Sequence, residues 1–432
     1  MLGITQPPPC RPRSVYSSPA LRPSPPKPPS PASSYLDAVL VSHFHLDHCG
    51  ALPYLVDFFN YQGPVVLTHP TASIVPIMLA DFMKVQLSED GGGGEGASSG
   101  GFAYSQRMID DACALFKKIE LLETISLCGG DLLVKCYYAG HVLGAAMFYI
   151  QSGDESIVYT GDFNMTADRH LAGAWIERLR PTVLITETTY ASTIREIKKS
   201  REREFLEEII NTLERGGKVL IPVFALGRAQ EICVLLEAFW SRCALPHPIY
   251  FAAGLSEKAN FFYKTFLQWT NDNLRTTFLQ QGHNLFDFAH VKPWDWSLQK
   301  TSTPMVVLAS PGMLHGGSSL TLFKEWCGDP LNTIIIPGYC MKATVGGQIL
   351  RGAKSVHVHG RIYEVRAKVC SFSFSAHADY AGIMQLIDKV RPRHLMLVHG
   401  EKTVMQTFAD KFRTLVGLPV HYPPNGSLLK ID

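Results

Sequence analysis

Residues 36–48 read LDAVLVSHFHLDH, a short apolar run that ends in three histidines and an aspartate. The apolar run has the length and the boundaries of a β-strand. Imidazole and carboxylate groups are the ligands that zinc and related divalent ions prefer. His43 and His45 alternate along the chain and suit one metal ion, which leaves Asp47 and His48 to face a second ion. The stretch therefore predicts a metal site at the end of a strand.

The composition around this stretch is that of a globular protein without a dominant charge. The chain has 432 residues, 46% of them hydrophobic and 18% charged, with a formal net charge of +2. This balance excludes a strongly basic, tail-like nucleic-acid binder but leaves room for a local basic channel. No apolar run reaches the roughly 18 residues of a membrane span, so we expect no membrane association. The 10 cysteines form no CxxC pair, and we expect reduced, mostly buried thiols in an intracellular protein.

The chain divides into four stretches of different texture. Proline and serine dominate residues 1–34, which are too poor in apolar side chains to offset the entropy of folding and are expected to be disordered. Residues 35–191 carry short strand-like runs and a flexible glycine-rich surface insertion at residues 91–101. Helix–strand alternation across residues 192–368 predicts a parallel, doubly wound sheet. Residues 369–432 return to the texture of the first part.

HFHLDH resembles the signature of the metallo-β-lactamase superfamily, in which a four-layer αββα fold carries a di-metal site. In that fold the remaining ligands lie at the ends of other strands. His141 in YYAGHVLGAA and Asp162 in YTGDFN each follow a predicted strand. The resemblance implies that His141 joins His43 and His45 on one metal ion and that Asp162 bridges both ions.

The second half of the chain narrows the family. The insertion at 192–368, followed by SFSAHADY and MLVHGE, resembles the β-CASP nucleases, the nucleic-acid branch of the superfamily. Glu187 in LITETTY, His377 in SFSAHADY and His399 in MLVHGE match its three further motifs. The resemblance implies that His399 completes the second metal site with the aspartate and the last histidine of HFHLDH, and that Glu187 orients His377, which protonates the leaving group. The expected fold is α/β: a four-layer αββα metallo-β-lactamase domain in two parts, 35–191 and 369–432, interrupted by a doubly wound β-CASP domain.

Other stretches are similar to eukaryotic RNA 3′-end endonucleases, namely GDFNMTADRHLAGAWI, KVLIPVFALGRAQE, SPGMLHGG and PGYC. The resemblance implies a zinc-dependent endonuclease that hydrolyses phosphodiester bonds during 3′-end processing of nuclear RNA, either small nuclear RNA or pre-mRNA. It implies two zinc ions as cofactors and Asp47, Glu187 and His377 as catalytic residues. Two metal ions about 3.5–4 Å apart activate a water molecule and neutralise the phosphate in such reactions. The expected location is the nucleus, with the cytoplasm as a second location.

Three residues of the insertion are candidates for RNA contacts. Arg228 in FALGRAQ begins a helix after a strand, which suits either a phosphate contact or a structural ion pair. Tyr339 and Lys342, in and after PGYC, are candidates for touching RNA, with a packing role as the alternative for Tyr339. The run REIKKSRER at residues 195–203 has mixed charge, and a solvated helical face is favoured over an RNA track.

The resemblance also implies partners other than the RNA substrate. In the family, a homologous non-catalytic β-CASP subunit binds a region that follows the third motif. This sequence ends soon after that motif, at PPNGSLLKID, so the partner-binding region is expected to be absent. Relatives also carry strands and an acidic LDCG motif before HxHxDH, whereas 42 residues precede His43 here, most of them in the Pro-rich stretch.

Two alternative functions remain at the level of sequence. One is a β-CASP exonuclease or DNA-repair nuclease, which shares the metal site; the histidine of the third motif favours the RNA group. The other is a non-catalytic scaffold subunit of a processing complex. Such subunits lack several metal ligands, whereas all seven candidate positions are filled here.

Overall fold

The computed structural model describes residues 35–90, 105–195, 198–252, 256–282 and 284–431. The Pro- and Ser-rich segment and the glycine-rich insertion predicted above lie outside these residues. Within them, none of the helices combines the length and the apolar character that crossing a membrane requires.

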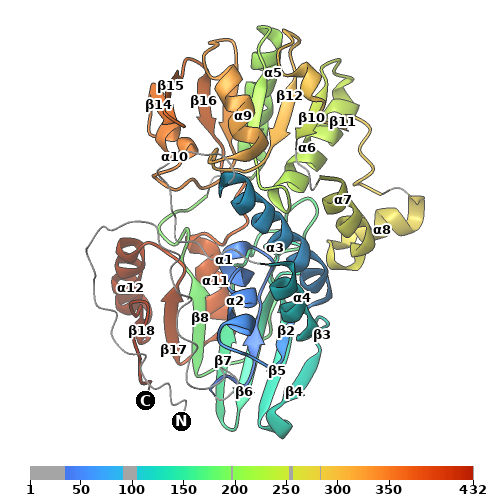
Figure 1. The fold of residues 1–432 in the computed structure, drawn as a ribbon. Helices are drawn as coiled ribbons and strands as arrows, with labels where there is room; N and C mark the ends of the chain where they lie inside the picture. The colour runs from blue at the N-terminus through green and yellow to red at the C-terminus, as the bar shows by residue number, and fades with distance from the viewer. Residues whose placement is uncertain (1–34, 91–104, 196–197, 253–255, 283, 432) are drawn as a thin grey trace, which may run out of the picture.

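Two sheets lie in the lower half of the molecule (Figure 1). The smaller sheet has three parallel strands, in the order β1 (Val39–Leu40), β2 (Val65–Thr68) and β3 (Phe116–Ile119). The larger sheet has the order β18 (Val420–His421), β17 (His394–Val398), β8 (Val183–Glu187), β7 (Glu155–Tyr159), β6 (Ala146–Ser152), β5 (Leu132–Tyr138) and β4 (Thr124–Leu127). The helices of this half are α1 (Leu46–Cys49), α2 (Leu52–Asp57), α3 (His69–Asp90), α4 (Gln106–Ala114), α11 (Tyr380–Val390) and α12 (Lys402–Val416).

Alternating side chains of β2 show how the layers of this half pack. Val66 shares a hydrophobic cluster with Phe148 of the larger sheet, whereas Val65 and Leu67 belong to the cluster that contains the helix residues. Since successive side chains of a strand point to opposite faces, β2 packs on the larger sheet with one face and on helices with the other. α3 contacts β2 and β3, and α12 contacts β17 and β18 at the other side. The order of helix, sheet, sheet and helix is the expected four-layer architecture.

The chain between β8 and α11 forms the upper half (Figure 1). Its sheet is parallel throughout, in the order β11 (Val291–Pro293), β10 (Ile249–Ala252), β12 (Val306–Ala309), β9 (Val219–Pro222), β13 (Thr333–Ile336) and β16 (Lys368–Ser371). Its helices are α5 (Lys198–Glu214), α6 (Arg228–Cys243), α7 (Ser256–Thr265), α8 (Asp272–Gln281), α9 (Gly317–Trp326) and α10 (Val345–Leu350), and β14 (Ser355–Val358) pairs with β15 (Arg361–Glu364) in a hairpin.

Both faces of this sheet are buried by helices. Val219 and Ile221 of β9 share a hydrophobic cluster with residues of α5 and α6, whereas Leu220 between them lies in a cluster with residues of α9 and α10. A parallel sheet covered on both faces is doubly wound, as the helix–strand alternation predicts.

Many predicted strands coincide with observed ones, but their ends differ. The strand predicted over residues 36–42 is reduced to β1, because the chain leaves the sheet after Val41, whose N–H donates to the carbonyl oxygen of Val66. The sheet of the insertion extends to Ser371, three residues past the predicted boundary at Lys368. The boundaries of the predicted domains otherwise stay predictions.

α3 is a long helix that the sequence does not predict. Its residues Pro70, Ala72, Ile74, Val75 and Leu79 are buried, and in a helix these positions spread over more than half of the circumference. The reason is that α3 packs against α1, α4, β2 and β3 at once. A helix buried on several sides lacks the one-sided periodicity by which helices are recognised in a sequence.

Several strands of the larger sheet end at one common edge. β7, β8 and β17 are parallel, and β5 runs in the same direction because both β5 and β7 are antiparallel to β6. The chain passes from the carboxyl end of β8 into the insertion, so this edge faces the upper half (Figure 1). The candidate site lies there.

Candidate metal centre

Loops at this edge bring the predicted ligands together. His43 and His45 follow β1, and the single turn of α1 carries Asp47 and His48. The other candidates come from the ends of the larger sheet and from the segment before α11: His141 follows β5, Asp162 follows β7, Glu187 ends β8, His399 follows β17 and His377 precedes α11.

Four donor atoms converge in the first group of candidate ligands. His45 Nδ1 lies 3.0 Å from His43 Nε2 and 3.2 Å from His141 Nε2. Asp162 Oδ2 lies 3.6 Å from His43 Nε2 and 3.7 Å from His141 Nε2. A tetrahedral zinc site with zinc–nitrogen distances of about 2.0–2.1 Å has edges of about 3.3 Å between ligand atoms. The spacing of these donors therefore fits one ion.

A second group shares Asp162 with the first. Asp162 Oδ2 lies 3.3 Å from His48 Nε2, and Asp162 Oδ1 lies 3.6 Å from His399 Nδ1. Asp47 Oδ2 lies 3.3 Å from His399 Nε2 and 3.6 Å from His48 Nε2. The two oxygens of Asp162 thus face donors of both groups, which suits a bridging carboxylate.

The histidines of the first group are held in the form that binds metal. His141 Nδ1 lies 3.0 Å from the carbonyl oxygen of Ala376, which can only accept, so Nδ1 carries the proton and Nε2 presents its lone pair to the cluster. Burial lowers the pKa of His43 and of His141 well below 6.5 and that of His45 to about 4. Neutral imidazole is the ligand form.

Charge in the second group is balanced by a hydrogen-bonded pair. The hydrogen bond to Asp47 raises the pKa of His399 to about 9, against the effect of burial. Burial raises the pKa of Asp47, but the hydrogen bond from His399 and the neighbouring His48 outweigh it and lower that pKa to about 2. Burial also opposes ionisation of Asp162, yet His48 and the surrounding histidines hold the pKa of that carboxyl well below its ordinary value.

Two buried atoms test whether a metal fits. His48 Nε2 and Asp162 Oδ1 are buried without a hydrogen-bond partner in the described part of the chain. An unpaired buried polar atom costs about 1–3 kcal/mol, so native proteins rarely leave one. Both atoms point into the second group, where a divalent cation would satisfy them. The donor set therefore fits two metal ions.

Two glycines allow the ligand loops to turn so closely. Gly140, before His141, has a φ of 69°, and a Cβ there would lie 2.7 Å from the carbonyl oxygen of Ala172. Gly161, before Asp162, has a φ of 52°, and its Cβ would lie 2.4 Å from that of Ser42. Any other residue at these positions would clash as well as adopt a left-handed conformation.

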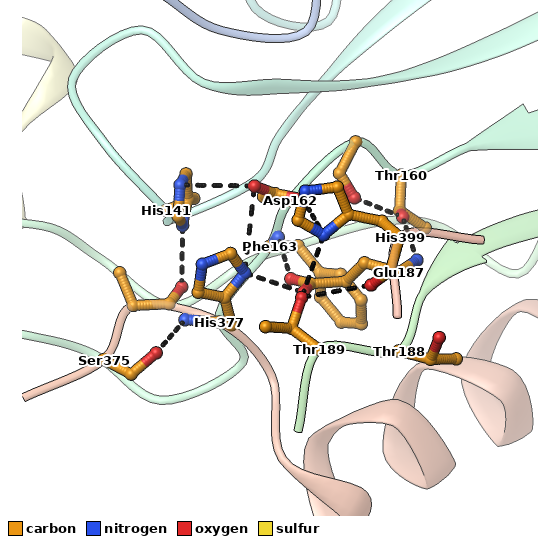
Figure 2. A network of polar contacts seen from close by, with 12 residues as sticks. His141, Thr160, Asp162, Phe163, Glu187, Thr188, Thr189, Ser375, His377 and His399 are labelled. Carbon is orange, nitrogen blue, oxygen red and sulfur yellow. Dashed lines mark hydrogen bonds and ion pairs between the residues drawn. The ribbon is translucent and has the colours of Figure 1, made fainter. Parts of the chain in front are cut away.

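A carboxylate–histidine pair lies beside the metal cluster (Figure 2). His377 Nδ1 is 2.7 Å from Glu187 Oε2, and Glu187 is held in turn by the backbone N–H of Phe163 and the hydroxyl of Thr189. Burial lowers the pKa of His377, but the charge of Glu187 and the hydrogen bond to it raise the pKa above the ordinary value. His377 Nδ1 also lies 3.8 Å from Asp162 Oδ2, so the pair borders the cluster directly.

The three candidate RNA contacts lie in different surroundings. Arg228 donates to Asp168 Oδ2 at 2.7 Å. This is the structural ion pair that the sequence offers as the alternative to a phosphate contact. Tyr339 is half exposed, and Lys342 Nζ lies 4.0 Å from Glu401 Oε1, close to the loop of His399. Their roles in RNA binding stay predictions.

Residues 195–203 are not simply a solvated face. Arg195 donates to the carbonyl oxygens of Ser375 and His377, and Lys198 lies 3.2 Å from Glu231 Oε1. Lys199 and Arg203 of the run are exposed, whereas Glu202 is buried. The expectation is therefore wrong for the start of the run, where Arg195 binds the segment that carries His377 and Lys198 binds α6 of the insertion.

Sequence reasoning missed Phe224, which follows β9 at the edge of the cluster. Its ring centroid lies 6.2 Å from that of His45, and 44% of the residue is exposed. In the sequence Phe224 is the last residue of the apolar run KVLIPVF and resembles any core residue of a strand. No pattern distinguishes it, because its exposure follows from where the strand ends.

Comparisons with known proteins agree with this architecture. A Metallo-beta-lactamase superfamily domain matches residues 29–189, a Beta-Casp domain matches 229–349, and a Zn-dependent metallo-hydrolase RNA specificity domain matches 362–423. The chain belongs to the metallo-β-lactamase superfamily and to its β-CASP branch.

Within that branch the chain is similar to subunits of RNA-processing complexes. It is 51% identical to Integrator complex subunit 11 of Danio rerio over 400 residues, which cover 92% of this chain and 65% of that protein. It is 47% identical to the Integrator complex subunit 11 homolog of Dictyostelium discoideum, with 92% and 54% covered. Cleavage and polyadenylation specificity factor subunit 3-II of Arabidopsis thaliana is 42% identical, with 90% and 62% covered. The chain thus spans 65% or less of the length of these relatives.

Proposed function

We propose that this chain is a metal-dependent endonuclease that hydrolyses phosphodiester bonds in RNA. The proposal rests above all on one observation, that two groups of candidate ligands sharing Asp162 adjoin the Glu187–His377 pair at the edge facing the insertion. A metal cluster alone would serve many hydrolytic reactions. A proton donor held beside it suits a reaction whose leaving group departs as an alkoxide.

The ligands divide between two ions. His43, His45 and His141 would hold the first ion with Asp162, and Asp47, His48 and His399 would hold the second with the same carboxylate. Two bound ions would supply the positive charge that activates a water molecule and neutralises the phosphate oxygens. We propose zinc for both sites, because a set rich in imidazole with few carboxylates suits zinc better than magnesium or calcium.

His377 would donate a proton as the phosphorus–oxygen bond breaks. Its Nδ1–H is engaged by Glu187, so Nε2 is the ring nitrogen that would carry the proton to the departing ribose oxygen. The electron pair of the broken bond stays on that oxygen, which the proton neutralises. Proton donation of this kind contributes about 10²–10⁴ in rate.

The substrate we propose is single-stranded RNA lying between the two halves. Phe224 borders the first metal group, and Lys342 lies near the loop of His399, so the insertion offers contacts at both sides of the cluster. An exposed aromatic ring beside a cleavage site suits stacking of an unpaired base. The similarity to Integrator complex subunit 11 and to cleavage and polyadenylation specificity factor subunit 3-II supports RNA over DNA.

The same similarity supports a role inside a larger complex. We propose that the chain acts in an Integrator-type assembly in the nucleus, on small nuclear RNA in preference to pre-mRNA, since the Integrator relatives are more similar than the polyadenylation ones. A homologous β-CASP subunit without a metal site would be its partner. A scaffold role for this chain itself is disfavoured because all seven candidate ligands converge in space.

The proposed function is tested with the purified chain and a circular single-stranded RNA, which only an endonuclease can open. We expect about two zinc ions per chain and cleavage that chelation abolishes. Asp47→Ala should lose the second ion, and His377→Ala should keep both ions but cut about 10²–10⁴-fold more slowly. Asp57→Ala, an exposed aspartate of α2, is the matched control and should behave as the unmodified chain.

Two outcomes would contradict the proposal. If neither the unmodified chain nor Asp47→Ala contains bound metal, the proposed metal centre does not exist. Cleavage that survives both Asp47→Ala and His377→Ala would show that the activity belongs to another site or to a contaminant.

A further inference from the structure

Two segments cross between the halves of the molecule, and they are joined beside the active site. Residues 188–195 leave β8 for the insertion, and residues 372–379 return from β16 to α11. A β-bridge pairs Tyr190 with Asp379, and the N–H of Tyr380 donates to the carbonyl oxygen of Thr193 at 3.0 Å. The returning segment carries His377, so its position depends on this junction.

Three successive carbonyl groups of the returning segment are held from two sides. The guanidinium of Arg195 donates to the carbonyl oxygen of Ser375 at 3.0 Å and to that of His377. The carbonyl oxygen of Ala376, between them, accepts from His141 Nδ1 at 3.0 Å. Arg195 and His141 together therefore hold three consecutive carbonyl groups, the last of which belongs to His377.

Arg195 is itself fixed by the same junction. Its backbone N–H donates to Asp379 Oδ2 at 3.0 Å, and its guanidinium lies 5.2 Å from the ring centroid of Tyr190. The other carboxylate oxygen of Asp379 accepts from the N–H of Gly382 at 2.9 Å and caps α11. A planar guanidinium with several fixed N–H groups can hold two carbonyls at once, which a lysine ammonium on a flexible stem does less well.

We propose that Arg195 is a positioning residue for the proton donor His377, a proposal that rests on the proposed function. Arg195 touches neither the candidate ligands nor the side chain of His377 in any of the contacts above. It acts by fixing the backbone from which the imidazole extends. A misplacement of about 1 Å in a reacting group can cost about 10²-fold in rate.

The test compares two leaving groups in otherwise identical RNA. In one substrate the phosphodiester bond that the unmodified chain cuts is natural. In the other substrate a sulfur atom replaces the bridging oxygen of that bond, the atom that departs with the leaving group. A thiolate departs without a proton, so its release does not need His377. Arg195→Gln should lower kcat for the natural bond by about 10²-fold, leave KM within about threefold, and leave cleavage of the sulfur bond within about threefold of the unmodified chain.

Four further variants serve as references for Arg195→Gln. His377→Ala should show the same pattern as Arg195→Gln. Asp47→Ala should cleave neither substrate. Arg195→Lys should cleave the natural bond faster than Arg195→Gln but more slowly than the unmodified chain. Arg203→Gln is the matched control, because Arg203 is an exposed residue of α5 that pairs only with Glu207 among the contacts described, at 3.6 Å. Bound zinc and the midpoint of thermal unfolding are measured for every variant, and both should stay close to the unmodified values in Arg195→Gln.

The outcomes separate this proposal from the proposed function. If the unmodified chain cuts neither substrate, the proposed function fails. If the unmodified chain cuts both substrates and Arg195→Gln cuts the natural bond at the unmodified rate, the positioning role is wrong. The role is also wrong if Arg195→Gln keeps its metal and its fold but cleaves both bonds more slowly by the same factor.

Discussion

Phe224 is an exposed aromatic residue beside the cluster of candidate ligands. It lies directly after β9, with its ring near His45 and nearly half of its surface exposed. The exposed part of this large apolar side chain is not covered by the protein. A nucleobase that stacked on the ring would cover it and would contribute about 1–3 kcal/mol to the free energy of binding.

Phe224→Ala should therefore weaken RNA binding more than chemistry. We expect the KM for single-stranded RNA to rise about tenfold with little change in kcat, and Phe224→Tyr to retain the original KM. Phe261→Ala serves as the control, because Phe261 is a still more exposed phenylalanine, in α7. A KM equal to that of the control variant would contradict the stacking role.

Residues differ in how far the sequence reveals them. The ligands of the first motif are predictable because three histidines and an aspartate at the end of one strand have no ordinary packing role. Phe224 and Arg195 are not predictable, since one ends an apolar run and the other begins a run of mixed charge. Their roles depend on contacts with residues far away in the sequence, as in the hydrogen bond from Arg195 to the carbonyl oxygen of Ser375.

Loops at the ends of strands carry the site at the scale of elements. The buried strands are predictable because short apolar runs bounded by glycine or polar residues have few alternatives. α3 escapes prediction because it is buried on several sides, and β1 is shorter than its apolar run because the loop to His43 begins early. Sequence periodicity thus gives the strands but not the turns that aim their ligands.

The turn between β7 and Asp162 makes this point testable. Gly161 has a positive φ, and its surroundings leave no space for a Cβ. Gly161→Ala should push the loop away from Ser42 and displace the carboxylate that both metal groups share. We expect this variant to lose most of its bound zinc, measured by elemental analysis, while its sheet remains folded by circular dichroism.

Gly153→Ala is the matched control for that experiment. Gly153 lies between β6 and β7 and has a φ of 56°, but a Cβ there would meet nothing within 4 Å. Both variants incur the left-handed penalty of about 1–2 kcal/mol, so only the clash distinguishes them. Equal zinc content in the two variants would show that the close approach at Gly161 is not needed for the site.

A buried charge network joins the two halves at the scale of the whole molecule. Residues 168–170, within GDFNMTADRHL, belong to the lower half and contact α5 and α6 of the insertion. His170 Nδ1 lies 2.6 Å from Glu231 Oε2, both side chains are buried, and the N–H of Arg169 donates to the same carboxylate. Lys198 lies 3.2 Å from Glu231 Oε1. The network holds the insertion against the lower half, so the GDFNMTADRHL segment supplies the candidate ligand Asp162 and also contacts the insertion.

Glu231→Gln should destabilise the protein and change how its stability depends on pH. Burial raises the pKa of Glu231, but the hydrogen bond with His170 and the charges of His170, Lys198 and Arg228 lower it well below the ordinary 4.5. Because the folded pKa is depressed, the stabilisation is present above pH 4.5 and is lost as the pH falls below that value. Removing one charge of a buried pair costs about 3–5 kcal/mol.

Denaturant unfolding across this range measures both effects. Near pH 7 the free energy of unfolding of Glu231→Gln should be about 3 kcal/mol below that of the unmodified chain. The difference should shrink below about pH 4.5, because the carboxyl group then takes up a proton in the unfolded chain while it is still ionised in the folded one. Glu207→Gln, on the exposed side of α5, should cost less than about 1 kcal/mol at either pH. A difference for Glu231→Gln that is equally small near pH 7 would mean that the apolar contacts between the halves, and not this network, hold the insertion in place. A difference that persists unchanged in acid would mean that the ionised carboxylate is not the stabilising form.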